Sequence, residues 1–167
     1  MLMQPDGQDQ DLLSLYQSII LDHGKSPRNT GRVERHDCSS EGRNPLCGDR
    51  VTVTAALDES DILTDLKFDA KGCAISIASA SMMTEAAKGL TTDEVQRISD
   101  AVRILCIEKF SGEDINGFLG ETLSARLESL RALSGVRQFP TRAKCALLPW
   151  QTLMACIQGN STASTER

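Results

Sequence analysis

Two stretches in the first half of the chain alternate between apolar and polar positions. Residues 51–57 read VTVTAAL, and residues 62–70 repeat the alternation after a polar turn at residues 58–61. A period of two residues is typical of a half-buried β-strand, so the pattern predicts an antiparallel hairpin. Strand pairing in such a hairpin would bring Cys47, just before the first strand, towards Cys73, just after the second.

Apolar residues recur at helical spacing elsewhere in the chain. Residues 110–120 contain three glycines and are expected to form a loop. We expect the last helix to begin at residues 146–148, because Pro149 lacks an N–H and fits best in a first helical turn. Cys73 and Cys145 would therefore each stand at the start of a helix. The predicted helices are residues 11–23, 73–89, 92–105, 121–133 and 146–157.

The remaining segments define the domain organisation. A chain of 167 residues is long enough for one compact core and short for two. We expect a disordered N-terminus over residues 1–10, a single domain over residues 11–158 and a flexible C-terminal tail over residues 159–167. Residues 32–44 are polar, and they predict at most a weak edge strand.

Composition limits the classes of partner and compartment. The formal net charge of −5 and the pI near 5.0 provide no broad basic field for nucleic acid or an anionic membrane. No segment approaches the roughly 18 apolar residues that a membrane span requires. We therefore expect a cytoplasmic protein with neither kind of partner.

The six cysteines are expected to serve as thiols, metal ligands or catalytic groups, because disulfides are rare in a reducing compartment. Cys106 and Cys156 lie within apolar helical patterns and are expected to be core residues. His36 and Cys38 stand two residues apart, but nothing nearby completes a tetrahedral set, so we interpret them as a solvated imidazole and an incidental thiol.

The other three cysteines and one carboxylate form a candidate metal site. Cys47 and Asp49 are two residues apart in a turn, and helix starts at Cys73 and Cys145 would favour their thiolates. Spacing alone leaves open that these cysteines are merely buried, since the paired Cys-x-x-Cys of structural zinc sites is missing. Glycines and cations beside the set strengthen the metal hypothesis: Gly48, Gly72, Arg50, Lys71, Arg142 and Lys144.

Four segments resemble a known family. They read LYQSIILDHGKSPRN, NPLCGDRVTV, KGCAISIASASMMTEAAKG and FPTRAKCALLPW, and the resemblance runs from about residue 12 to residue 157. In this order they are similar to the IscU/NifU N-terminal family of iron–sulfur cluster assembly proteins, and most similar to its SufU branch. Two features favour that branch: Lys144 stands where IscU proteins have a histidine, and residues 110–133 fill a connection that is shorter in IscU.

The resemblance implies a fold and a site. The fold would be α+β, with a small antiparallel sheet of about three strands packed against about five helices, in agreement with the elements predicted above. Cys47, Asp49, Cys73 and Cys145 would bind one Zn²⁺ ion tetrahedrally, and Arg142 would balance their charge. Three departures affect local structure and partner docking: Gly24 replaces an aromatic residue, residues 35–43 are unusually polar, and Pro149 is unusual.

The resemblance also implies an activity. SufU proteins take persulfide sulfur from a SufS-type cysteine desulfurase that uses pyridoxal phosphate, and Cys47 matches the acceptor. In that scheme a histidine of the desulfurase replaces Cys47 on zinc and frees its thiolate, and the sulfur passes on to the downstream iron–sulfur assembly machinery. Two alternatives remain open: a scaffold that builds a [2Fe-2S] cluster on the same four residues, and a structural zinc module that binds partners without exchanging sulfur.

Overall fold

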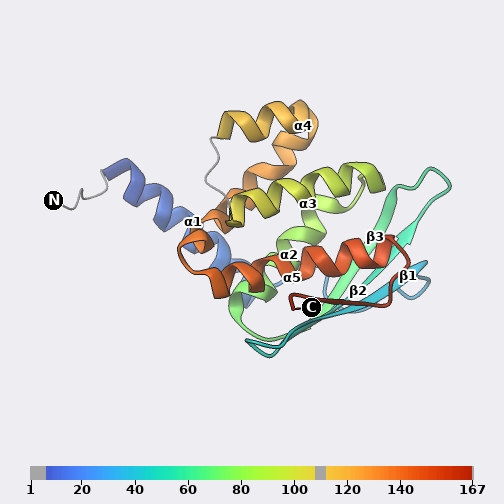
Figure 1. Ribbon diagram of the computed structural model, residues 1–167. Helices are drawn as coiled ribbons and strands as arrows, with labels where there is room; N and C mark the ends of the chain where they lie inside the picture. The colour runs from blue at the N-terminus through green and yellow to red at the C-terminus, as the bar shows by residue number, and fades with distance from the viewer. Residues whose placement is uncertain (1–6, 108–111, 167) are drawn as a thin grey trace.

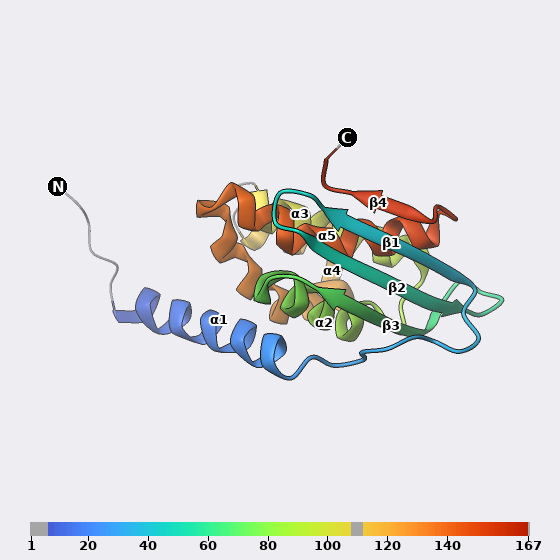
Figure 2. The same cartoon turned by 90° about the horizontal axis from the view of Figure 1, so that it is seen from below.

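The computed structural model describes residues 7–107 and 112–166, and its centre is a four-stranded sheet (Figures 1 and 2). The strands lie in the order β3-β2-β1-β4, where β1 to β3 are antiparallel and β4 is parallel to β1. The α+β prediction is confirmed, with one strand more than expected. The strands are β1 (Cys38–Asn44), β2 (Asp49–Leu57), β3 (Leu63–Lys71) and β4 (Thr162–Ser164).

Helices cover one face of this sheet in two layers. α2 and α5 pack directly on the strands, while α3 packs on α5 and α4 packs on α3 (Figure 1). α1 lies beside α2 and extends past the sheet (Figure 2). The helical elements are α1 (Gly7–Lys25), α2 (Ala74–Ala87), α3 (Thr92–Ile107), α4 (Gly112–Leu127), the 3₁₀ helix η1 (Glu128–Gln138) and α5 (Pro140–Ile157).

The predicted hairpin is confirmed as β2 and β3. Val53 pairs with Phe68, and Arg50 pairs with Lys71 at the end of the ladder. The apolar side chains of both strands, including Val51, Val53, Leu66 and Phe68, are buried under the helices. The register therefore places Asp49 next to the segment that leads from Lys71 into α2.

The prediction of a weak edge strand in residues 32–44 was wrong about its place in the sheet. β1 lies inside the sheet because β4 pairs with its outer side, Glu41 opposite Thr162 and Arg43 opposite Ser164. Residues 162–164, within the expected C-terminal tail, thus form a strand of the sheet. Gly42 permits the close packing of α5 on β1, because a Cβ there would overlap the Oγ1 atom of Thr152 on α5.

A disulfide joins Cys38 of β1 to Cys156 of α5, and it corrects the expectation that all six cysteines are free. The two Cα atoms are 5.3 Å apart, a spacing that suits a disulfide. Sequence reasoning missed the pair because 118 residues separate its members and because α5 was not expected to cross β1. The other four cysteines are free.

Several helix boundaries also differ from those predicted. α1 begins at Gly7, four residues before the expected start, and residues 1–6 of the expected disordered segment lie outside the described residues. Much of the predicted 110–120 loop belongs to α4, which is interrupted at Gly120, where φ is 79°. α5 begins with Pro140 in its first turn, so Pro149 lies inside the helix.

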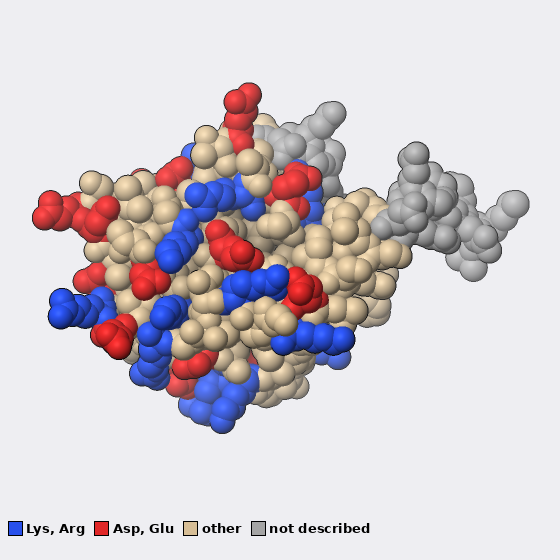
Figure 3. Space-filling model, turned by 180° about the vertical axis from the view of Figure 1, so that it is seen from behind, with Lys and Arg blue, Asp and Glu red and all other residues tan. Residues whose placement is uncertain are grey.

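Charged side chains are mixed across the surface. On the face shown in Figure 3, Lys and Arg are interspersed with Asp and Glu. None of the described helices combines the length and the apolar character that crossing a bilayer requires.

Candidate metal centre

The turn between β1 and β2 presents Cys47 and Asp49. The carbonyl oxygen of Asn44 accepts hydrogen bonds from the backbone N–H groups of Cys47, at 3.2 Å, and Gly48, at 2.9 Å. Gly48 adopts φ = 70°, a left-handed conformation that glycine reaches without steric cost. This turn leaves Cys47 half-buried, whereas Asp49 is 2% exposed.

The third donor arrives from α5. The ligand atoms of Cys47, Asp49 and Cys145 all lie within 4.8 Å of one another. Cys145 is fully buried. Two thiols and a carboxylate that are remote in the sequence therefore share one small volume.

Cys73 joins this group from the start of α2. It is the N-cap residue of the helix, and its backbone N–H donates a 2.9 Å hydrogen bond to Oδ1 of Asp49. Its Sγ lies 4.0 Å from Oδ2 of the same carboxylate. A Cβ at Gly72 would overlap Oδ1 of Asp49, so only glycine permits this close approach. The structure thus brings all four predicted ligands to one place, with Cys73 beside the tighter trio.

The position of Cys145 in its helix differs from the prediction. α5 begins at Pro140, six residues before the earliest predicted start, and the Cys145 thiol lies 3.5 Å from the carbonyl oxygen of Thr141 in the preceding turn. The helix-start argument for a stabilised thiolate therefore applies to Cys73 and fails for Cys145. Burial raises the pKa of the Cys145 thiol, and hydrogen bonding with the neighbouring carboxyl and thiol groups raises it further.

Arg142 lies one turn before Cys145 on α5, at the exposed rim of the site. Its proximity to the thiol of Cys73, and secondarily to Cys145 and Cys47, raises the pKa of its guanidinium. Two other cations named from the sequence pair with acidic side chains: Lys144 pairs with Glu166, and Arg50 lies 3.6 Å from Glu41. The prediction that Arg142 balances the charge of the thiols is compatible with this geometry.

The donor set fits a divalent cation. Several thiolates and a carboxylate confined to one buried volume repel one another, and a metal ion removes that repulsion by binding them all. Thiolate and carboxylate are both ligands that Zn²⁺ accepts in tetrahedral sites.

Cys106 lies apart from this donor set. It is buried on α3, burial raises the pKa of its thiol to about 12, and it is the core residue expected from the sequence.

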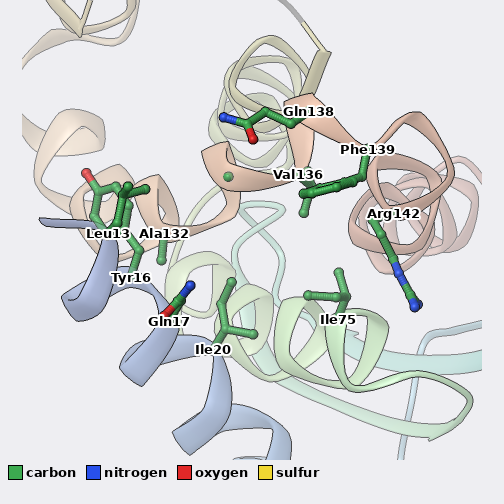
Figure 4. Close-up of a pocket in the computed structure, with 11 residues that line it drawn as sticks. Leu13, Tyr16, Gln17, Ile20, Ile75, Ala132, Val136, Gln138, Phe139 and Arg142 are labelled. Atoms are coloured by element: carbon green, nitrogen blue, oxygen red, sulfur yellow. The ribbon is translucent and has the colours of Figure 1, made fainter. Parts of the chain in front are cut away.

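An apolar groove of about 710 Å³ adjoins the site (Figure 4). It runs between α1, the start of α2 and the junction of η1 with α5, and Arg142 lies at its edge. Phe139 is 59% exposed beside it, and Leu46, next to Cys47, is 62% exposed. Large exposed apolar side chains beside a reactive site favour contact with another protein. The lining includes Leu13, Tyr16, Ile20, Ile75 and Val136.

A family comparison agrees with this architecture. The model of the NifU-like N-terminal domain matches residues 15–110, which contain three of the four predicted ligands. The chain belongs to the NifU-like N-terminal domain family. α5 and β4 lie beyond the matched range, so Cys145, the fourth predicted ligand, comes from outside it.

Two relatives with curated descriptions cover most of the chain. The zinc-dependent sulfurtransferase SufU of Bacillus subtilis is 41% identical over 143 residues, which span 86% of this chain and 89% of that protein. The iron–sulfur cluster assembly scaffold protein IscU of Streptococcus pyogenes is 32% identical over 149 residues, which span 89% of this chain and 86% of that protein. Both are relatives within the NifU-like family.

Solved structures of the family share the fold. A candidate iron–sulfur cluster assembly scaffold protein for the SUF system, from Fervidobacterium islandicum, superposes with a TM-score of 0.70 and 31% identity, and covers 86% of this chain and 97% of that one. The N-terminal part of a NifU-like protein from Brucella abortus superposes with a TM-score of 0.71 and 25% identity, and covers 89% of this chain and 95% of that one.

Proposed function

We propose that this protein is a zinc-dependent sulfurtransferase of the SufU type. It accepts persulfide sulfur from a SufS-type, pyridoxal-phosphate-dependent cysteine desulfurase and passes the sulfur on to the iron–sulfur assembly machinery in the cytoplasm. The observation that carries the proposal is the cluster of Cys47, Asp49 and Cys145 within 4.8 Å, with Cys73 beside it. The similarity to a zinc-dependent sulfurtransferase supports the choice of metal.

In this proposal Cys47, Asp49, Cys73 and Cys145 hold the zinc ion. Zinc keeps bound thiols deprotonated at neutral pH and has no redox chemistry of its own. The hydrogen bond from Cys73 N–H to Asp49 orients the carboxylate towards the thiols. Arg142 at the rim offsets the excess negative charge of three thiolates and one carboxylate.

Cys47 is the proposed sulfur acceptor because it is accessible and lies in an exposed turn. Cys145 is fully buried and out of reach of a partner's persulfide. The Cys47 thiolate attacks the outer sulfur of a protonated persulfide on the desulfurase. The sulfur–sulfur bond breaks, the desulfurase cysteine leaves as a thiolate, and Cys47 carries the persulfide with its proton. The transfer needs no external oxidant or reductant.

The exposed apolar residues around the site are the proposed contact with the desulfurase. Leu46 is the neighbour of Cys47, and Phe139 lies three residues before Arg142 at the edge of the groove. A partner that buries Leu46 would press directly on the turn that carries Cys47. Docking and release of the acceptor thiol would in this way be coupled.

A second candidate function is the assembly of a [2Fe-2S] cluster on the same ligands. The relatives described as IscU scaffold proteins favour it. Lys144, in the position where IscU proteins have a histidine, argues against it, because its ammonium group cannot bind a metal while protonated and is paired with Glu166.

Metal analysis and a desulfurase assay test the proposal together. As-isolated protein should be colourless with about one zinc per chain, whereas iron, sulfide and a brown colour would support the scaffold. Sulfide release by a SufS-type desulfurase should rise when the protein is added. Cys47→Ser should abolish the rise, and Cys106→Ser should nearly preserve it. Equal loss in both variants would refute the assignment of Cys47.

A further inference from the structure

Asn44 contacts three of the four proposed ligands. Its side-chain Nδ2 donates to Oδ2 of Asp49 at 3.2 Å and to Sγ of Cys145 at 3.5 Å. Its carbonyl oxygen accepts the backbone N–H of Cys47 at 3.2 Å. The residue is fully buried at the end of β1. One side chain therefore bridges the β2 ligand and the α5 ligand.

The orientation of this amide follows from its partners. The carboxylate of Asp49 only accepts hydrogen bonds when ionised, so the nitrogen of Asn44 must face it. Oδ1 of Asn44 is then left for a donor on the other side. The hydroxyl of Thr165 supplies it at 3.1 Å.

The C-terminal segment is fixed to β1 beside this amide. Thr165 N–H donates to the carbonyl oxygen of Arg43 at 3.1 Å, and Glu41 N–H donates to that of Ser161 at 2.9 Å. Glu166, the next residue, pairs with Lys144, the neighbour of Cys145. Figure 2 shows β4 alongside β1. Thr165 is thus held in register with Asn44 by backbone pairing and by an ion pair.

We propose that Asn44 is a positioning residue of the metal centre and that Thr165 fixes its amide. The inference rests on the metal-binding part of the proposed function and adds residues 161–166 to the site. An amide that donates to both Asp49 and Cys145 holds these two ligands at one separation before the ion arrives. Partners behind metal ligands commonly change metal affinity about 10- to 100-fold when they are lost.

The test measures zinc affinity of the full-length protein by competition with a chromogenic chelator, and it records the absorption spectrum of the Co²⁺-substituted protein. Asn44→Ala should weaken zinc binding about 10- to 100-fold and alter the cobalt ligand-field bands. Thr165→Val, which removes only the hydroxyl, should change both readouts in the same direction by a smaller amount, and Thr165→Ser should restore them. Thr162→Val is the matched control, because Thr162 is exposed on β4, the strand that ends one residue before Thr165.

A double variant tests whether Thr165 acts through Asn44. Asn44→Ala combined with Thr165→Val should bind zinc no more weakly than Asn44→Ala alone, because the hydroxyl has then already lost its acceptor. If Thr165→Val matches both wild type and Thr162→Val in affinity and cobalt spectrum, the inference is overturned while the zinc site stands. If wild-type protein fails to bind zinc, the proposed function falls and the inference falls with it.

Discussion

Cys38 of β1 and Cys156 of α5 form a disulfide. It links the first residue of the strand that leads into the Cys47 turn to the helix that carries Cys145. In denaturant without reductant, thiol titration should therefore find four free thiols per chain, and all six after reduction. Since the bridge closes a long loop, reduction should lower the free energy of unfolding by about 2–4 kcal/mol. Thermal melting with and without reductant measures this change.

Cys38→Ser provides the control for this prediction. The variant lacks the bridge, so its melting temperature should be lower than that of the oxidised wild-type protein and should not change with reductant. A wild-type melting temperature that also ignores reductant would contradict the bridge as a stabilising element. The comparison matters because disulfides are rare in the reducing compartment expected for this protein.

Gly72→Ala should damage the metal centre. Gly72 has φ = 149°, and a Cβ there would overlap Oδ1 of Asp49, so the carboxylate must move away from the thiols. We expect a loss of zinc affinity of about tenfold or more, by analogy with lost ligand positioning. Gly31→Ala is the matched control, because Gly31 also has a positive φ of 108° but nothing lies within 4 Å of its added Cβ. Equal zinc affinity in the two variants would exclude the steric argument.

His23 should make the metal-free protein less stable in acid. It is buried, its Nδ1 lies 2.7 Å from the Ser81 hydroxyl, and that hydroxyl accepts the backbone N–H of Arg28. Burial and the charge of Arg28 lower the pKa of His23 below 6.5, although Glu85 and Asp22 oppose them.

The sign of this pH effect follows from linkage. The unfolded chain takes up the proton more readily than the folded protein, so stability is full above the unfolded pKa and declines as pH falls through the folded pKa. The melting temperature should fall between pH 7 and pH 5, and His23→Gln should remove part of that decline. His36→Gln should leave it unchanged, because His36 is exposed. A decline unaffected by His23→Gln would assign the acid sensitivity to other groups.

Leu46→Ser should weaken the response to the desulfurase without changing the metal. Leu46 is 62% exposed beside Cys47, so its loss should leave zinc content and melting temperature unchanged. We expect about a tenfold rise in the concentration that half-stimulates the desulfurase, equivalent to about 1.4 kcal/mol of contact energy. Ile107→Ser is the control, since Ile107 is 56% exposed at the end of α3, a helix without candidate ligands. Similar effects of both changes would argue against a contact at Leu46.

The β2–β3 hairpin, and the closeness of its two open ends that follows from strand pairing, could be predicted from sequence because both depend on local periodicity. The alternation in residues 51–57 and 62–70 predicts both strands, and their pairing predicts that Cys47 approaches Cys73; the structure adds that Asp49 bonds the backbone N–H of Cys73. The polar run CSSEGRN offered no comparable signal. Its strand is stabilised inside the sheet by β4, which pairs with it from more than 100 residues away in the sequence.

The error in the predicted start of the last helix, and so in the helix position of Cys145, came from one residue, Pro149. The sequence predicts Pro149 in the first turn of the last helix, whereas Pro140 occupies that position and α5 accommodates Pro149 in its interior. Pro149 and its neighbours Leu148 and Trp150 are buried, and this burial contributes favourable free energy that opposes the cost of an internal proline. Tertiary packing of this kind cannot be read from spacing. Asn44 was missed for a similar reason, since only the fold shows that its amide meets Cys145.

The donors of the metal centre are scattered along the polymer, and this affects when the ion can be taken up. Asn44 and Cys145 are 101 positions apart, and Asp49 and Cys73 are 24 apart. A short zinc finger gathers its ligands locally, so that its ion drives folding. Here most of the long-range contacts must form before a complete coordination shell exists, and such contacts form slowly. Under the proposed function, zinc capture would therefore be a late folding event, and its rate would report on completion of the native topology.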